Sequence, residues 1–330
     1  MNYVRLVVAV LACLTASGVS HAQALRVPYA SLSPNYGPLW LGDVAGLFKK
    51  NNLDVQPLYI SSGSVIVPAL LSGEAKIANM GGAAAINAWA RGADLAIVAV
   101  SSDRVLHVVM APPKIKNPEA LRGKRVATDR YGSLSEVVLR EALRYHNLIP
   151  GKDVTIIQSG GVPERLGALK AGAADAALLT GDVKLQAEKL GFHALIDLSQ
   201  LPLRYPSSTI VVTRSYLRDN KDVVKRFLKG WIEGIKVFKT DREFTIRVLG
   251  RYLKSGDREI LEQTYDSYRD VHEAAPHPHP AGVAFALERL AETFPPAAKL
   301  RAEDLVTKEI MAELESEGFV RTLYADVTKR

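Results

Sequence analysis

The sequence predicts an α/β protein built from two similar lobes, followed by a helical C-terminal segment. The first observation is an internal repeat: residues 54–78 read again at residues 153–177, with seven identical positions at a constant offset of 99. In each copy an apolar run leads into a Gly/Ser turn, a short helix and a strand of small residues. The second observation is the C-terminal third, where helical periodicity replaces strand patterns. Two facing α/β lobes form a cleft, and clefts bind ligands.

Residues 1–22 have the pattern of a secretory signal peptide. A positive charge precedes the apolar run Leu6–Leu14, which is too short to span a bilayer, and small residues at Ala22 and Ala24 offer cleavage positions. Cys13, the only cysteine, lies in this leader. The mature chain therefore has no disulfide, thiolate nucleophile or cysteine-based metal site. We expect an exported, periplasmic protein.

The first lobe is expected to alternate strands and helices. Its elements are a first strand at Leu25–Tyr29, a helix at Leu39–Asn51, a second strand at Leu53–Ile60, a helix ending at Gly73, and a buried strand at Leu95–Val100.

Two β-rich runs, Val105–Ala111 and Thr209–Thr213, are flanked by prolines and bracket the second copy of the repeat. We interpret them as two crossovers that form a two-segment hinge. Lobe one is then built from residues 23–109 and 212–330, and lobe two from residues 110–211.

From residue 219 onward the apolar residues follow helical spacing. The run from Lys221 to Lys239 carries an apolar stripe at i, i+3 and i+4, which is typical of a helix face in a core. Further helices are predicted near Glu243–Leu253, Arg258–Val271, Gly282–Thr293 and Ala302–Glu317. Because this segment has no strands of its own to cover, we expect it to pack on lobe one and brace the hinge.

Composition and motifs exclude several function classes. The formal net charge is +7, but the basic residues are spread along helix faces, so we expect no nucleic-acid partner. Gly-x-Ser-x-Gly elbows, phosphate loops and His-Glu-x-x-His zinc helices are missing from the sequence. Residues His277–Pro280 alternate histidine with proline, which favours an extended link over a chelating turn. We expect no metal, no cofactor and no catalytic residue.

Several short sequence segments resemble those of a known family. They are Pro38-Leu39-Trp40, Ala45-Gly46-Leu47-Phe48, Ala69-Leu70-Leu71-Ser72-Gly73, Leu121–Ala127 and Gly132-Ser133. In order and spacing they are similar to the substrate-binding proteins of ABC transporters in the nitrate/sulfonate/taurine and thiamine-precursor group (SsuA-like, NMT1/THI5-like). The resemblance implies the type II periplasmic-binding-protein fold, a small-molecule solute and the transmembrane subunits of an ABC permease as partners. We expect a monomer.

The ligand-binding residues are expected where strands end and helices begin, because ligands of open α/β sheets lie at the carboxyl ends of the strands. Small residues there let a ligand approach backbone N–H groups. The predicted set in lobe one is Ser33, Asn35, Tyr36, Ser62, Gly63, Ser64, Gly81, Gly82, Ala83 and Ser101, and in lobe two it is Tyr131, Gly132, Ser133, Gly161, Val162, Thr180 and Asp182.

Structural roles compete with these assignments. Ser133 and Glu136 fit a capping box, with or without a ligand contact. The pair Gly81-Gly82 fits a tight turn, and Asp182 fits a helix N-cap; if Asp182 faces the cleft, it favours an N–H donor over a bare anion. Four arginines, Arg104, Arg130, Arg165 and Arg204, lie near the predicted cleft edges, where one of them could pair an anion.

The function we predict is an exported solute receptor that closes around one small molecule and delivers it to a permease. Sulfonates, carboxylates, nitrate-like anions and pyrimidine-like solutes all fit a Ser/Gly/Tyr pocket. Two alternatives stay open: a ligand-sensing subunit of a membrane receptor kinase, and an enzyme resembling the thiamine-pyrimidine synthases of this fold. The cysteine-free mature chain counts against the enzyme, because the resemblance implies a cysteine-rich segment for those synthases.

Overall fold

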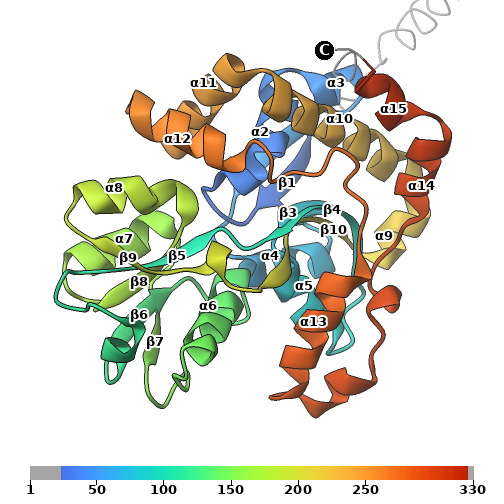
Figure 1. The fold of residues 1–330 in the computed structure, drawn as a ribbon. Coiled ribbons are helices and arrows are strands. Elements are labelled where there is room, and N and C mark those ends of the chain that lie inside the picture. The colour runs from blue at the N-terminus through green and yellow to red at the C-terminus, as the bar shows by residue number, and fades with distance from the viewer. Residues whose placement is uncertain (1–23, 326–330) are drawn as a thin grey trace, which may run out of the picture.

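The computed structural model describes residues 24–325, which form two α/β lobes with helices packed around them (Figure 1). The predicted signal peptide lies outside the described residues. Between residues 24 and 325 no helix combines the length and the apolar character needed to cross a bilayer.

Each lobe is built on one five-stranded sheet. The sheet of lobe one has the order β2 (Val55–Tyr59), β1 (Leu25–Tyr29), β3 (Ile77–Met80), β10 (Arg204–Val212) and β4 (Ala96–Arg104). The sheet of lobe two has the order β7 (Thr155–Gln158), β6 (Arg125–Thr128), β8 (Ala176–Thr180), β5 (His107–Ala111) and β9 (His193–Asp197). In each sheet one strand, β10 or β5, runs antiparallel to both neighbours.

The helices cover the sheets and extend the C-terminal segment. Those of lobe one are α2 (Gly37–Val44), α3 (Leu47–Lys50), α4 (Gly63–Ser72) and α5 (Gly82–Trp89), and those of lobe two are α6 (Leu134–Tyr145), α7 (Val162–Lys170) and α8 (Lys184–Lys189). The C-terminal helices are α9 (Arg214–Asp219), α10 (Lys221–Thr240), α11 (Arg242–Leu253), α12 (Arg258–Tyr268), α13 (Pro280–Ala291), α14 (Glu309–Ser316) and α15 (Phe319–Leu323).

The sequence repeat corresponds to a structural repeat. Helices α4 and α7 begin at residues 63 and 162, and strands β3 and β8 begin at residues 77 and 176, so both pairs keep the offset of 99. In both copies a glycine in the left-handed region follows the helix, Gly73 at φ +77° and Gly172 at φ +69°. Only glycine adopts this conformation at no steric cost, which explains why both copies keep it.

The chain crosses between lobes earlier than the sequence suggested. The two passages are the short segments after β4, between Arg104 and His107, and after β9, between Asp197 and Arg204. Both runs predicted as crossovers are strands instead: Val105–Ala111 contains β5 of lobe two, and Thr209–Thr213 continues β10 of lobe one. An apolar β-rich pattern marks a buried strand, whereas a passage of a few extended residues leaves no pattern of its own.

The C-terminal segment packs on lobe one, as expected. Helix α10 buries Phe227, Trp231 and Phe238 against α2 and the sheet of lobe one. The approach to α2 is very close, because a Cβ built on Gly234 would lie well inside 3.0 Å of the Pro38 carbonyl oxygen. Figure 1 also shows α12 lying over lobe two, so the segment reaches both lobes.

Two predicted helices are broken. The one expected over residues 39–51 divides into α2 and α3 at Gly46, which has φ +68°. The one expected over residues 302–317 is a short 3-10 turn at Ala302–Asp304 followed by α14. Gly46, in its left-handed conformation, ends the helical hydrogen bonding of α2. Leu305 and Val306 are not helical but run beside the sheet, where the Leu305 carbonyl accepts a backbone hydrogen bond from Ile97 of β4.

Candidate ligand-binding site

A small cavity of about 30 Å³, here named the inner cavity, lies between the lobes. It is found where the loops after β1, β3, β6 and β8 converge, which is the carboxyl end of each strand. Lobe one contributes Ser31 and Gly81 among others, and lobe two contributes Asp129 and Thr180. By volume it holds only a few water molecules, so the lobes must separate to admit a solute.

Two glycines show that the lobes are in contact. A Cβ on Gly81 of lobe one would lie 2.7 Å from the Cβ of Leu134 in lobe two. A Cβ on Gly161 of lobe two would lie well inside 3.0 Å of the Tyr59 hydroxyl in lobe one. Real Cβ atoms do not approach that closely, so these glycines allow the helix N-termini of the two lobes to meet. The structure therefore describes the closed arrangement of the lobes.

Residues from both lobes that line the inner cavity carry buried polar atoms without hydrogen bonds. Within the described residues, Ser31 Oγ, Asn35 Oδ1 and His107 Nδ1 are buried and make no hydrogen bond. A buried polar group without a partner costs roughly 1–3 kcal/mol. Such a cost is accepted where the missing partner is a ligand. The local backbone carries a second cost, because Ser62 at the start of α4 has φ +83°.

The inner cavity is acidic or neutral rather than basic. Asp129 is 7% exposed, and burial raises the pKa of its carboxyl group, although Arg165 and the Ser133 hydroxyl oppose the shift. Burial also lowers the pKa of His107 to about 3, so its imidazole is neutral at physiological pH. No lysine or arginine is among the described residues that line this cavity.

Ser133 has two roles at once. Its hydroxyl accepts a hydrogen bond from the backbone N–H of Glu136 at 3.2 Å, which caps α6 as predicted, and it donates to Asp129 Oδ1. The Glu136 carboxylate accepts from the N–H of Gly132 at 3.2 Å rather than from Ser133 itself. Asp129 Oδ1 also accepts from the N–H of Arg130 at 2.5 Å. These bonds fix the Asp129 carboxylate at the cavity wall.

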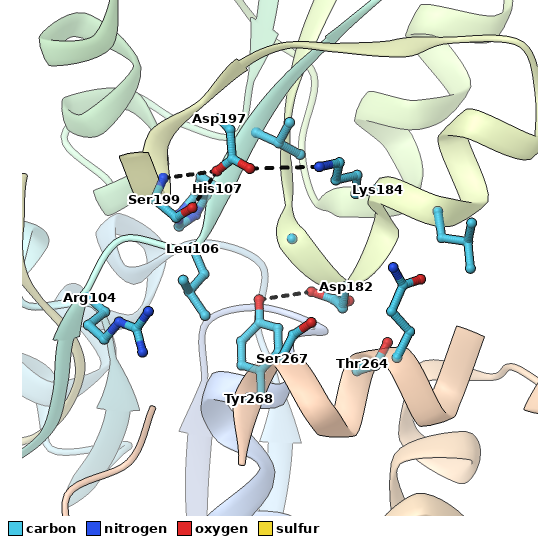
Figure 2. Close-up of a pocket in the computed structure, with 14 residues that line it drawn as sticks. Arg104, Leu106, His107, Asp182, Lys184, Asp197, Ser199, Thr264, Ser267 and Tyr268 are labelled. Carbon is cyan, nitrogen blue, oxygen red and sulfur yellow. Dashed lines mark hydrogen bonds and ion pairs between the residues drawn. The ribbon is translucent and has the colours of Figure 1, made fainter. Parts of the chain in front are cut away.

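A second cavity of about 300 Å³, the side cavity, lies between lobe two and α12 and shares His107 with the inner cavity. Figure 2 shows Tyr268 of α12 pointing at Asp182, whose Oδ1 accepts a hydrogen bond from the Tyr268 hydroxyl at 3.3 Å. Asp182 is 8% exposed, and burial raises its pKa to about 6. Across the cavity Lys184 lies 3.7 Å from the Asp197 carboxylate. The contact between Tyr268 and Asp182 joins the C-terminal segment to lobe two.

Eight of the predicted residues line one of these two cavities. Ser33, Asn35, Tyr36, Gly63, Gly81, Ser133 and Thr180 line the inner cavity, and Asp182 lines the side cavity. Whether they contact a ligand is a proposal.

The other predicted residues lie elsewhere. The hydroxyls of Ser62 and Ser64 are hydrogen-bonded to each other at 2.9 Å. Gly82 packs on Pro206. Ala83 and Gly132 line a separate cavity beside α6. Ser101 is hydrogen-bonded to His272 Nδ1 at 3.0 Å in the core. Tyr131 is 51% exposed, and its hydroxyl donates to the Ile156 carbonyl. Gly161 contacts lobe one, and Val162 is buried in the core of lobe two.

The four candidate arginines are not grouped at one site. Arg104 lines the side cavity, and Arg130 is exposed. Arg204 is exposed and pairs with Asp103 at 3.0 Å. Arg165 is 2% exposed and donates from Nε to the Gly161 carbonyl and from Nη1 to the Leu178 carbonyl. Its charge acts on Asp129 and His107 through space, without lining the inner cavity.

Sequence reasoning missed part of the cavity wall, namely Ser31, His107, Asp129, Leu134, Ser135 and Ser207. Asp129 follows directly after β6, so the strand-end rule could have found it. His107 and Ser207 belong to β5 and β10, the strands that enter each sheet from the other lobe, and no local pattern marks them.

The NMT1/THI5-like family model matches residues 33–242, which is more than half of the chain. The chain belongs to the NMT1/THI5-like family. The resemblance seen in the sequence is thereby confirmed. A Bacillus subtilis (strain 168) protein named as a binding protein, YtlA, is 23% identical over 265 residues, which cover 77% of this chain and 78% of that protein.

Solved structures share the fold. The alkanesulfonate-binding protein SsuA from Xanthomonas axonopodis pv. citri, bound to MOPS, matches with a TM-score of 0.72 at 20% identity, over 86% of this chain and 98% of that one. The nitrate-binding protein NrtA from Synechocystis PCC 6803 matches with a TM-score of 0.74 at 14% identity, over 89% of this chain and 88% of that one. The fold of this NMT1/THI5-like chain is therefore that of periplasmic binding proteins, as predicted.

Proposed function

We propose that this protein is an exported receptor that binds one small polar solute in the inner cavity and delivers it to an ABC permease. The observation that carries the proposal is the set of buried polar atoms without partners, contributed by both lobes to one cavity at the strand ends. A solute that bonds both lobes stabilises the closed arrangement, because the open arrangement offers it only one of the two sets of contacts.

The lining of the inner cavity favours a pyrimidine-like or other uncharged solute over a sulfonate, carboxylate or nitrate-like anion. Asp129 and Asn35 Oδ1 are acceptors, so they call for N–H or O–H donors on the solute. The N-termini of α5 and α6 supply backbone N–H groups for its acceptors. An anion would meet the Asp129 carboxylate without an arginine or lysine among the lining residues.

The mechanism is conformational. The relatives compared with this chain are named as binding proteins, which supports a receptor over an enzyme resembling the pyrimidine synthases of the family. A solved structure with a TM-score of 0.71 is named as the ligand-binding component of an ABC-type import system from Staphylococcus aureus, which supports delivery to a permease over docking on a receptor kinase. Genes for an ATPase and a permease next to this one would support transport, whereas a sensor-kinase gene would support signalling.

Thermal unfolding of the mature protein against a panel of pyrimidines, amines, sulfonates and carboxylates tests the proposal. A solute at 100 times its dissociation constant stabilises the native state by ~2.7 kcal/mol, which shifts the midpoint by about 4 °C. We expect one uncharged class to give this shift with no product formed. Turnover of any panel compound would refute the receptor assignment.

Two serine variants test whether the solute binds in the inner cavity. Ser31→Ala removes a hydroxyl without a partner at the inner cavity, so we expect unchanged or slightly higher stability and a much smaller response to the solute. Ser316→Ala removes an exposed hydroxyl far from both cavities as a control. Equal responses from the two variants would remove the inner cavity as the site.

A further inference from the structure

A cavity of about 380 Å³, here named the arginine-lined cavity, is lined by residues of α5, α6 and α13. Figure 1 shows that these three helices lie near one another where the two lobes meet. The arginine-lined cavity is separate from the inner cavity, with no lining residue in common. Lobe two supplies residues of α6, lobe one supplies residues of α5, and α13 and β10 close the remaining sides. At this volume it is large enough for a small organic molecule.

Arginine is the commonest charged residue of the lining. The four arginines are Arg91, Arg140, Arg144 and Arg289, and two carboxylates, Glu136 and Glu141, accompany them. Carboxylates of the protein neutralise this charge. Arg140 pairs with Glu136, and Arg144 pairs with Glu141 at 2.5 Å and with Glu292 at 3.4 Å. Arg289 pairs with Glu292 at 2.8 Å and with Glu288 at 3.0 Å. Arg91 has no carboxylate partner among the described residues; its Nη1 donates to the Asn87 carbonyl at 2.8 Å, and the guanidinium stacks over Phe294. The formal charges of the arginines and of their carboxylate partners balance, but a guanidinium group has five N–H donors, so the cluster keeps N–H donors that these pairs do not use.

Two buried donors in this cavity have no hydrogen-bond partner. Tyr205 is 0% exposed, and its hydroxyl makes no hydrogen bond within the described residues. Nε of Arg289 makes none either, since the nearest carboxylate oxygen of Glu141 lies 4.0 Å away. Burial raises the pKa of Tyr205, so its hydroxyl stays protonated and can only be satisfied as a donor by an acceptor that enters the cavity. Both donors come from the lobe-one side, whereas Arg140 and Arg144 face the cavity from lobe two.

We propose that the arginine-lined cavity is a second ligand site, distinct from the solute site, that binds a small multivalent oxyanion carrying carboxylate or phosphate groups. The oxyanion accepts hydrogen bonds from the Tyr205 hydroxyl and Arg289 Nε on one side and pairs with Arg140 and Arg144 on the other. Arginine is suited to this because its planar guanidinium bonds two oxygens of one carboxylate or phosphate group.

An anion held in this way bridges α6 of lobe two and α13 behind lobe one. It therefore stabilises the closed arrangement, and by linkage it raises the affinity for the solute. This coupling rests on the proposed function. Binding of the anion does not depend on the proposed function, so either proposal can fail while the other holds.

Isothermal titration of the mature protein with sodium citrate and, separately, with sodium phosphate at constant ionic strength tests the proposal. We expect saturable binding of at least one of them; which one binds distinguishes carboxylate from phosphate chemistry. Tyr205→Phe keeps the ring and removes only the hydroxyl, and Arg289→Gln removes the charge and Nε. Each is expected to weaken binding by about tenfold or more, because a hydrogen bond to a charged group is lost.

The control is Arg218→Gln, which removes an exposed arginine that pairs with its neighbour Asp219. It is expected to bind the anion like the wild type. Unfolding midpoints of all variants, measured without anion, check that each is folded, and Tyr205→Phe is expected to be at least as stable as the wild type because it removes a buried hydroxyl without a partner. Absence of saturable binding by both anions, or equal binding by Tyr205→Phe, Arg289→Gln and the control, would overturn the proposal.

Discussion

Gly161→Ala is predicted to disfavour closure of the lobes while leaving the fold intact. Gly161 has φ −66°, which any residue adopts, so the backbone itself tolerates alanine. The new Cβ would collide with the Tyr59 hydroxyl of lobe one and would lie 3.4 Å from Ser61 Oγ. Tyr59 cannot swing away freely, because its ring packs on Tyr29 with centroids 5.6 Å apart.

The magnitude follows from the overlap. Overpacking a close contact costs about 1–3 kcal/mol. A second contact, 2.8 Å to Glu164 Oε2 of the same lobe, exists in both arrangements, but it involves the far end of a flexible side chain that can turn away. The cost that differs between the arrangements is therefore the contact with Tyr59. The solute affinity should therefore fall by roughly 5- to 150-fold. In the open arrangement the same methyl group meets no atom of lobe one, so the free energy of unfolding should change by less than about 1 kcal/mol.

The assay is calorimetric titration with the panel compound that gives the largest thermal shift. Gly167→Ala is the matched control, because it lies in the same helix and a Cβ there meets nothing within 4 Å. If Gly161→Ala binds the solute as tightly as the wild type, the contact between Gly161 and Tyr59 is not part of the functional closed state. An equal loss in both variants would attribute the effect to α7 rather than to closure.

Two further predictions concern stability, and a third concerns the contact between lobe two and the α12 region. The carboxyl group of Asp182 has a pKa of about 6 in the folded protein, compared with 3.8 for an unperturbed aspartate. Because the folded protein binds this proton more tightly, the wild type loses stability as pH rises from about 4 to 6. Asp182→Asn should remove this loss, which is worth about 3 kcal/mol, and parallel pH profiles of the two proteins would contradict it. Gly234→Ala should lower the free energy of unfolding by about 2 kcal/mol or more in urea, because the Pro38 carbonyl cannot move aside; an unchanged midpoint would show that α2 and α10 separate easily. Lys189→Ala removes ion pairs at 2.9 and 2.8 Å to two carboxylates of the α12 region, and it should open the lobes slightly at low salt and not at high salt; a salt-independent effect would point to packing instead.

Much of the fold was predictable because local patterns carry it. The repeat placed α4, α7, β3 and β8 correctly, since each copy forms the same β-α-β unit from its own residues. The passages between lobes were not predictable in this way. β5 and β10 look like any buried strand, and only pairing with partners far along the chain shows which sheet each of them joins.

The candidate site was predictable at strand ends and not elsewhere. Asn35, Gly81 and Ser133 follow strands and line the inner cavity, as the strand-end rule requires. Ser101 also follows an apolar run, but β4 continues to Arg104, so its side chain stays in the core and bonds His272. His107 lies at the cavity because the chain crosses between lobes there, which depends on tertiary structure alone.

The measurement that tests the central claim most directly is small-angle X-ray scattering during a titration with the panel compound of largest thermal shift. The claim is that a single solute between the lobes holds them closed. It predicts a decrease in the radius of gyration that saturates at one equivalent of solute in the wild type and requires a higher solute concentration in Gly161→Ala. Tight binding with no change in the radius of gyration, or saturation at more than one equivalent, would contradict it.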